Sequence, residues 1–436
     1  MMNESALRIS TLLGEKYYTV HHKSGLVIYV CPKDVSTTVA TLAVNYGGAN
    51  LRFRLADEEK FTEIPAGVAH FLEHKMFEME DGVDAFDYFA QTGADANAFT
   101  SSLTTCYLFS CTECFDESLE ILLDMVSVPH FTEESVARER DIIAQEITMT
   151  EDQPSDAIYY GLMDALYENN GHRIRVAGTV DSISGITAET LRRAHSVFYN
   201  LRNMALFVCG NVTPECVMSV ADAILVKAED APFEVERMIE PETVVHKRFY
   251  REMQVSKPLF CIGVKDTDIS SDPRERMKKQ CVMDILNDVL FSRSSPFRNE
   301  LYESGLISSS MSYGFTHCLE VSHNILSGES SDPEAVYEKY RAYIEQIKEA
   351  GIDPAAFERC RRVLYANCVS SFDDASEICH NMMDTILDGE EPFEEPHIIA
   401  SLTVDDANRV LRSLFREDAT AMAVIAPLTE NKEETV

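Results

Sequence analysis

Short apolar runs of strand length recur along the first half of the chain, and helix-compatible segments separate them. The strands predicted there cover residues 17–22, 26–31, 38–46 and 204–210. Pro65 suits the first turn of a helix, and the apolar run that follows it, 66–77, continues until Asp81 and Gly82 break it. The first half of the chain is therefore expected to contain both strands and helices.

The same succession of elements begins again in the second half. A polar, acidic stretch, 227–243, separates the two rounds and is typical of a linker between domains. The second round has predicted strands at 247–254, 259–265, 308–315, 322–329 and 419–425, and predicted helices at 274–290, 332–350 and 354–371. We therefore expect two domains of one duplicated architecture, 1–226 and 244–436, whose last strands correspond.

One pentapeptide in the helix predicted at 66–77 carries the candidate chemistry. Positions i and i+4 of a helix lie on one face, so His70 and His74 can bind one metal ion. Glu73 flanks that face and is placed to polarise a metal-bound water. The order H-x-x-E-H is the inverted form of the zinc peptidase signature H-E-x-x-H. Histidines on helix faces are mostly structural, so the motif alone is a hypothesis.

A catalytic zinc site needs a third protein ligand and leaves its fourth position to water, whereas a structural site is closed by four protein ligands. The helix predicted after its N-cap, Thr132, offers Glu139 and Glu146, seven residues apart on one partly apolar face. In so acidic a chain, the alternative is that both glutamates belong to a solvated helix face.

With these motifs the chain resembles the pitrilysin, insulinase and mitochondrial processing peptidase family of zinc metallopeptidases. In that family H-x-x-E-H is followed downstream by a helix of the form E-R-x-x-[IV]-x-x-E-[IV], and residues 139–147 have that form. The resemblance implies one Zn²⁺ per chain, with Glu146 as the third ligand beside His70 and His74. It also implies that Glu139 is an acid that supports the catalytic site.

The resemblance covers essentially the whole chain. Asn97 and Ala98 resemble the edge strand along which the family pairs an extended substrate peptide, and Gly178-Thr179 is similar to its post-helix turn. The implied fold is α+β, with two homologous αβ repeats whose antiparallel and mixed sheets pack against helices. The two repeats would form half of a clamshell chamber, and only the first would carry metal ligands.

The second half departs from the family pattern in a run that often carries an arginine and a tyrosine, which grip the substrate carbonyl. Tyr302 and Ser308 occupy those positions here, and Arg298 is nearby but off register. Leu103 stands where relatives often have an acid. The departures suggest that a partner chain, in a heterodimer or a homodimer, supplies the missing groups.

Composition limits the class of partner and the compartment. The chain has 38 Lys and Arg against 73 Asp and Glu, a formal charge of -35, which argues against a nucleic-acid partner. This charge either attracts cationic peptides or serves solubility alone. No apolar run approaches a membrane span, and residues 1–11 lack the features of a signal peptide.

The twelve cysteines are scattered singly, mostly in apolar runs, and fit reduced, buried thiols. Since residues 1–11 also lack signal-peptide features and no run approaches a membrane span, we expect a cytoplasmic protein. Cys111 and Cys114 have C-x-x-C spacing, but no second such pair at zinc-ribbon spacing accompanies them. We interpret them as a strand end that turns into the helix predicted at 115–128.

The sequence thus predicts a zinc metalloendopeptidase that hydrolyses peptides or unfolded segments. His70, His74 and Glu146 would hold the metal, Glu73 would accept the proton of the attacking water, and the strand at Asn97 and Ala98 would align the substrate. One alternative is a structural or assembly subunit that retains the peptidase fold, although such subunits usually lose a ligand. Another is a metal-dependent hydrolase of a non-peptide substrate.

Overall fold

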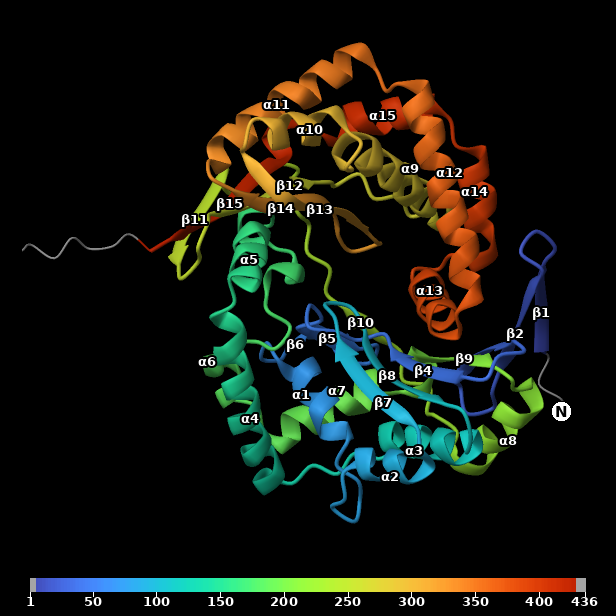
Figure 1. Ribbon diagram of the computed structural model, residues 1–436. Helices are drawn as coiled ribbons and strands as arrows, with labels where there is room; N and C mark the ends of the chain where they lie inside the picture. The colour runs from blue at the N-terminus through green and yellow to red at the C-terminus, as the bar shows by residue number, and fades with distance from the viewer. Residues whose placement is uncertain (1–4, 429–436) are drawn as a thin grey trace, which may run out of the picture. The chain divides into compact units, whose positions relative to one another are not determined.

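The structure, a computed structural model, describes residues 5–428 and divides into two compact units, each assembled from three segments of the chain (Figure 1). Within the described part of the chain, no helix combines the length and the apolar character that crossing a bilayer requires. Among the described residues, unit 1 comprises 5–148, 174–237 and 369–392, and unit 2 comprises 149–173, 238–368 and 393–428.

Unit 1 contains a seven-stranded sheet in the order β1-β2-β3-β9-β4-β8-β7. Neighbouring strands within this sheet are antiparallel, except for β3 and β9, which are parallel. The strands, in that order, are Ser5–Ser10, Glu15–His21, Val27–Pro32, Met204–Gly210, Thr38–Val44, Thr105–Cys111 and Asp95–Thr100. Strand β7 is therefore an edge strand, as the sequence predicts.

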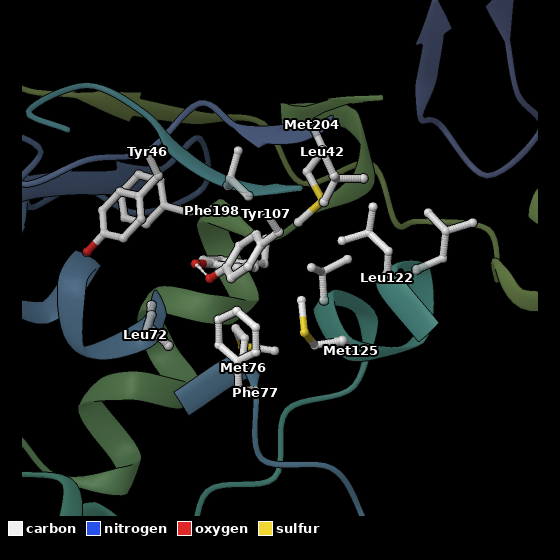
Figure 2. Packing of buried hydrophobic residues seen from close by; sticks show 14 of the residues in the cluster. Leu42, Tyr46, Leu72, Met76, Phe77, Tyr107, Leu122, Met125, Phe198 and Met204 are labelled. Carbon is white, nitrogen blue, oxygen red and sulfur yellow. Dashed lines mark hydrogen bonds between the residues drawn. The ribbon is translucent and has the colours of Figure 1, made fainter. Parts of the chain in front are cut away.

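Helices surround this sheet and complete one apolar core. The helices are α1 (Val68–Met76), α2 (Ala85–Thr92), α3 (Phe115–Ser127), α4 (Glu133–Glu151, whose last turn belongs to unit 2), α6 (Val180–Ser184), α7 (Ala188–Phe198), α8 (Pro214–Ile224) and α13 (Ala375–Leu387). Phe77, directly after α1, lies near Tyr107 of β8, with 6.1 Å between the ring centroids, and Leu72 and Met76 of α1 belong to the same core (Figure 2). Each fully buried apolar side chain of this kind stabilises the fold by about 2 kcal/mol.

Unit 2 contains a five-stranded sheet in the order β11-β15-β12-β14-β13. The strands, in that order, are Arg248–Met253, Thr420–Pro427, Leu259–Lys265, Ser322–Ser330 and Ile307–His317. The helices are α5 (Pro154–Leu166), α9 (Pro273–Phe291), α10 (Pro296–Glu303), α11 (Pro333–Ala350), α12 (Pro354–Ser370, whose last residues belong to unit 1), α14 (Glu395–Ser401) and α15 (Val404–Leu414). Strands β11 and β15 are parallel and the other pairs are antiparallel.

The two sheets share one topology. Five strands of unit 1, β3-β9-β4-β8-β7, have the same order and the same directions as β11-β15-β12-β14-β13 of unit 2. In each sheet, the strand that comes last along the chain, β9 or β15, lies between the first two strands of this set. The predicted duplication is therefore present in the strand order.

Each unit also takes in a helix from the other half of the sequence. Helix α5 packs on β11, β12 and β15, so closely that a Cβ on Gly161 would meet Phe249 at 2.3 Å. Helix α13 packs on β4 and β9, where the Cys379 thiol lies 3.7 Å from the Val39 carbonyl oxygen. The compact units therefore do not follow the boundaries 1–226 and 244–436, because these two apolar helix faces are buried on sheets that lie far away along the chain.

The segment expected to be a linker, 227–243, is partly structured. Phe233–Val235 forms β10, which pairs with β5 (Arg52–Leu55), and β5 pairs in turn with β6 (Thr62–Glu63). Near the end of the segment, the Glu240 carboxylate accepts hydrogen bonds from three successive backbone N–H groups, of residues 168–170, at 2.7–3.0 Å. It also accepts one from Lys265 Nζ at 3.0 Å. An anion held by a backbone nest and an ammonium group anchors this end of the segment to unit 2.

Buried histidines are expected to make the stability of unit 2 depend on pH. Burial, with a contribution from His172, lowers the pKa of His323 to about 3, while His323 Nδ1 lies 2.9 Å from the Tyr167 hydroxyl. Unfolded histidine has a pKa of about 6.5. Between these two values the unfolded chain binds more protons than the folded chain, so the free energy of unfolding falls as pH falls from about 6.5 toward 3.

We expect the urea midpoint of the zinc-free protein to decrease over this pH range, and His323→Gln to make the decrease shallower. His246→Gln, at an exposed histidine, is the matched control. Its urea midpoint should change with pH as steeply as that of the unmodified protein. Equal slopes in both variants would contradict the assignment of this acid sensitivity to His323.

Candidate metal centre

The N-terminus of α1 is fixed by two glycines. Gly67 caps the helix with φ at 100°, and a Cβ there would meet the Ala177 carbonyl oxygen at 2.7 Å. A Cβ on Gly178, with φ at 73°, would come even closer to the Ala66 carbonyl oxygen, to which the Ser182 hydroxyl donates a hydrogen bond at 2.8 Å. Helix α1 therefore begins at Val68, and Pro65 precedes the helix instead of occupying its first turn. Because Gly67 has a left-handed backbone conformation, the regular helix cannot extend further toward the N-terminus.

The apolar residues inside the pentapeptide orient its polar ones. Phe71 and Leu72 are fully buried in the core of unit 1, and they hold α1 in one rotation about its axis. His70 and His74 then project from another face, where their rings lie edge to face at 4.6 Å between centroids. Packing of the core thus sets the direction of both imidazoles.

Helix α4 supplies the facing carboxylates. Its Val136, Ile143 and Ile147 are buried in the same core, which turns the adjacent face, with Glu139 and Glu146, toward α1. The helix begins after Thr132, whose hydroxyl accepts a hydrogen bond from the Ser135 N–H at 3.1 Å, as the predicted N-cap requires.

Three side chains converge with the geometry of a metal site. Glu146 Oε1 lies 3.5 Å from His70 Nε2, and Glu146 Oε2 lies 3.5 Å from His74 Nε2. Ligands at zinc's usual distances of about 2.0–2.1 Å and tetrahedral angles lie about 3.4 Å apart. Within residues 5–428, these three residues form the one group of three or more His, Cys, Asp or Glu residues whose ligand atoms all lie within 4.8 Å of one another. The donor set therefore fits zinc with three protein ligands.

Glu139 orients one ligand. Its Oε1 lies 2.9 Å from His74 Nδ1, which leaves Nε2 facing Glu146. Burial alone would lower the pKa of His74, but the hydrogen bond to Glu139 and the surrounding carboxylate charges raise it. The same bond lowers the pKa of Glu139. A carboxylate on the outer nitrogen of a ligand histidine fixes its tautomer and increases its basicity.

Glu73 lies beside this group with a different partner. Its Oε2 accepts a hydrogen bond from the Thr100 hydroxyl, at the end of the edge strand β7, at 2.5 Å. Burial raises the pKa of Glu73, and the charge of Glu146 adds to that rise, while Thr100 and His74 oppose it. A carboxyl group with a raised pKa suits transfer of a proton in both directions near neutral pH.

The predicted substrate strand borders the site. Asn97 is exposed on β7, and its Oδ1 accepts a hydrogen bond from the Ala98 N–H at 2.9 Å. Because β7 is an edge strand, one of its sides has no neighbouring strand in the sheet of unit 1. Such a side can bind an extended peptide as an added strand.

Other candidate residues lie outside this group. Cys111 ends β8, and Cys114 precedes α3 with φ at 53°, which matches the expected strand-to-helix turn. In unit 2, Tyr302 is 62% exposed and Ser308 is exposed. Arg298, in contrast, is buried near Tyr313, where burial raises the pKa of the tyrosine and the arginine charge opposes that rise.

Comparison with known proteins places the chain in a family. Residues 61–180 match the family described as Insulinase (Peptidase family M16), and residues 185–364 match the Peptidase M16 inactive domain. The protein named uncharacterized zinc protease YmfH of Bacillus subtilis is 31% identical over 419 residues, which cover 95% of this chain and 97% of the relative. The chain belongs to peptidase family M16.

Solved structures of M16 proteins share its fold. An M16-like peptidase from Alicyclobacillus acidocaldarius superimposes with a TM-score of 0.91 at 30% identity, covering 96% of this chain and all of the other. Pitrilysin superimposes with a TM-score of 0.73 at 14% identity, over 98% of this chain but 47% of its own length. The M16 chain described here therefore spans about half the length of pitrilysin.

Sequence reasoning missed three polar residues around the site. Thr100 was expected only as part of the edge strand, and neither Lys75 nor Ser135, which hydrogen-bond each other, was singled out. Their importance follows from contacts between segments far apart along the chain, and such contacts leave no regular spacing in the sequence.

We expect the purified protein to hold about one zinc per chain, because three protein ligands and water complete a catalytic site. His70→Ala and His74→Ala should each empty it, while His21→Ala, at an exposed histidine, should retain the metal. Elemental analysis after dialysis measures the content. Full zinc occupancy in both ligand variants would place the metal elsewhere.

Proposed function

We propose that this M16 chain is a zinc-dependent metalloendopeptidase that hydrolyses peptides or unfolded segments. The observation that carries the proposal is the convergence of His70, His74 and Glu146, with 3.5 Å between the Glu146 oxygens and the imidazole nitrogens. Relatives named zinc proteases support the same conclusion. An intact ligand set argues against an assembly subunit that has lost catalysis.

Zinc bound there would polarise a water molecule and bring its pKa toward neutrality. Glu73 then accepts the proton of the attacking water on its carboxylate and delivers it to the amine that leaves. Thr100 holds that carboxylate in place through its 2.5 Å hydrogen bond. Glu139 fixes His74 in the tautomer that presents Nε2, and so acts on the ligand without touching the substrate.

We infer that the substrate binds as an extended strand along β7. For the Ala98 N–H to pair with a peptide, it must exchange its hydrogen bond to Asn97 Oδ1 for one to the substrate backbone. Thr100 ends the same strand and contacts Glu73, so a peptide paired with β7 passes beside the proposed base. Strand addition selects extended chains, and therefore unfolded segments, over folded proteins.

A homologous partner chain is part of the proposal. The chain covers about half of pitrilysin, and the positions expected to grip the substrate carbonyl hold Tyr302 and Ser308. A second M16 chain, in a heterodimer or a homodimer, would supply these groups.

A cytoplasmic location is also proposed. It rests on the thiols, because no disulfide joins the twelve cysteines, which all lie within residues 5–428, and most of them are buried.

Glu73→Gln keeps the shape of the side chain and removes the proton acceptor. We expect zinc to stay bound while hydrolysis of a quenched peptide falls by roughly two to four orders of magnitude. Glu80→Gln, an exposed glutamate shortly after α1, is the matched control and should keep full activity. Unchanged turnover in Glu73→Gln would remove this residue from the mechanism.

Groups that grip the substrate carbonyl also stabilise the negative charge that develops on its oxygen during the reaction. Loss of such groups lowers the rate by on the order of a hundredfold or more. The isolated chain is therefore expected to be weakly active, and a co-expressed homologous partner should restore cleavage of the same peptide library. Strong cleavage by a monomer, with no response to the partner, would contradict the two-chain proposal. Arg298 and Tyr313 would then be the groups in this chain to test.

A further inference from the structure

Lys75 follows the ligand His74 directly and is 1% exposed, although its side chain ends in a charge. Its Nζ pairs with the Glu78 carboxylate, one turn later in the chain, and donates a hydrogen bond to Ser135 Oγ at 3.0 Å. Ser135 belongs to α4, so this bond joins the two helices that carry the candidate zinc ligands.

Burying the Lys75 ammonium group has a free-energy cost that an apolar side chain would not have. Removing such a charge from water costs several kcal/mol, and an apolar side chain of similar length is often as stable or more stable in its place. The pairing with Glu78 and Ser135 offsets part of that cost. Stability of the core alone therefore does not account for a lysine at this position, and the contacts that it makes indicate another role.

The Ser135 hydroxyl has a second task at the N-terminus of α4. It accepts a hydrogen bond from the Thr132 N–H at 3.3 Å, while the Thr132 hydroxyl accepts one from the Ser135 N–H at 3.1 Å. This reciprocal pair is the capping arrangement that fixes the first turn of a helix. Lys75 therefore contacts α4 within its capped first turn.

Successive polar contacts then run along one face of α4. Ser135 contacts Lys75, Glu139 contacts His74 one turn later, and Glu146 approaches both histidines two turns after that. Spacings of four and seven residues keep these three side chains on one side of a helix. Of these contacts, the one at Ser135 involves neither a proposed ligand nor a carboxylate at the metal site.

We propose that Lys75 is a positioning residue that fixes the register of α1 against α4 and so preorganises His70, His74 and Glu146 for zinc. The inference rests on the proposed zinc function. Helices held in register lose less conformational freedom when the metal binds, which makes binding tighter. Partners that orient ligands from outside typically change metal affinity by about 10- to 100-fold when they are removed.

Three variants separate positioning from structural stabilisation. Lys75→Met removes the ammonium group and keeps the length. Ser135→Ala removes the acceptor together with one half of the cap. Thr132→Ala is the matched control, because it breaks the other half of the cap and leaves the Lys75 to Ser135 hydrogen bond in place.

Two quantities are measured on the full chain, the melting temperature of the zinc-free protein and the zinc dissociation constant by chelator competition. Lys75→Met is expected to melt close to the unmodified protein and to bind zinc about tenfold or more weakly. Thr132→Ala should melt lower and bind zinc with unchanged affinity. Ser135→Ala should show both effects, and adding Lys75→Met to it should weaken zinc binding little further.

Unchanged zinc affinity in Lys75→Met, or in Ser135→Ala if the lysine variant does not fold, would overturn the positioning role. Weaker binding in Thr132→Ala as well would also overturn it, because affinity would then follow helix stability in general. If the unmodified protein binds no zinc, the proposed function fails instead, and the two failures are distinguishable.

Discussion

The alignment of α1 with α4 is the constraint on which the candidate site depends. His74 and Glu139 are 65 residues apart in the chain, yet their side chains meet at 2.9 Å, and Glu146 reaches both histidines from the same helix. Buried apolar residues hold each helix in one rotation, with Phe71 on α1 and Ile143 on α4 in one core. A small rotation of either helix would move the ligand atoms out of range of a single ion.

The polar contacts between α1 and α4 add a constraint on the position of each helix along its axis. Apolar burial is strong but does not distinguish small shifts along a helix axis, whereas a hydrogen bond at 3.0 Å between Lys75 and Ser135 does. Glu139 adds a second directional contact. The cost of burying an ammonium group is understandable if precise alignment matters more here than maximal stability.

Helical spacing identified the candidate ligand residues in the sequence, but the choice of Glu146 as the third ligand came from the resemblance to the family. His70 and His74 share a face by their separation of four, and Glu139 and Glu146 share one by their separation of seven. The duplication was also predictable, since strand patterns repeat on both sides of residues 227–243. The packing of α5 and α13 was not, because an amphipathic pattern shows that a helix buries one face without showing on which sheet.

The central claim is that His70, His74 and Glu146 hold one zinc ion. Anomalous diffraction from crystals of the zinc-loaded protein, recorded on both sides of the zinc absorption edge, tests it most directly. We expect one peak per chain, about 2.0–2.2 Å from the Nε2 atoms of both histidines and from a Glu146 oxygen. A peak bound by cysteine sulfur, or none near these three residues, would contradict it.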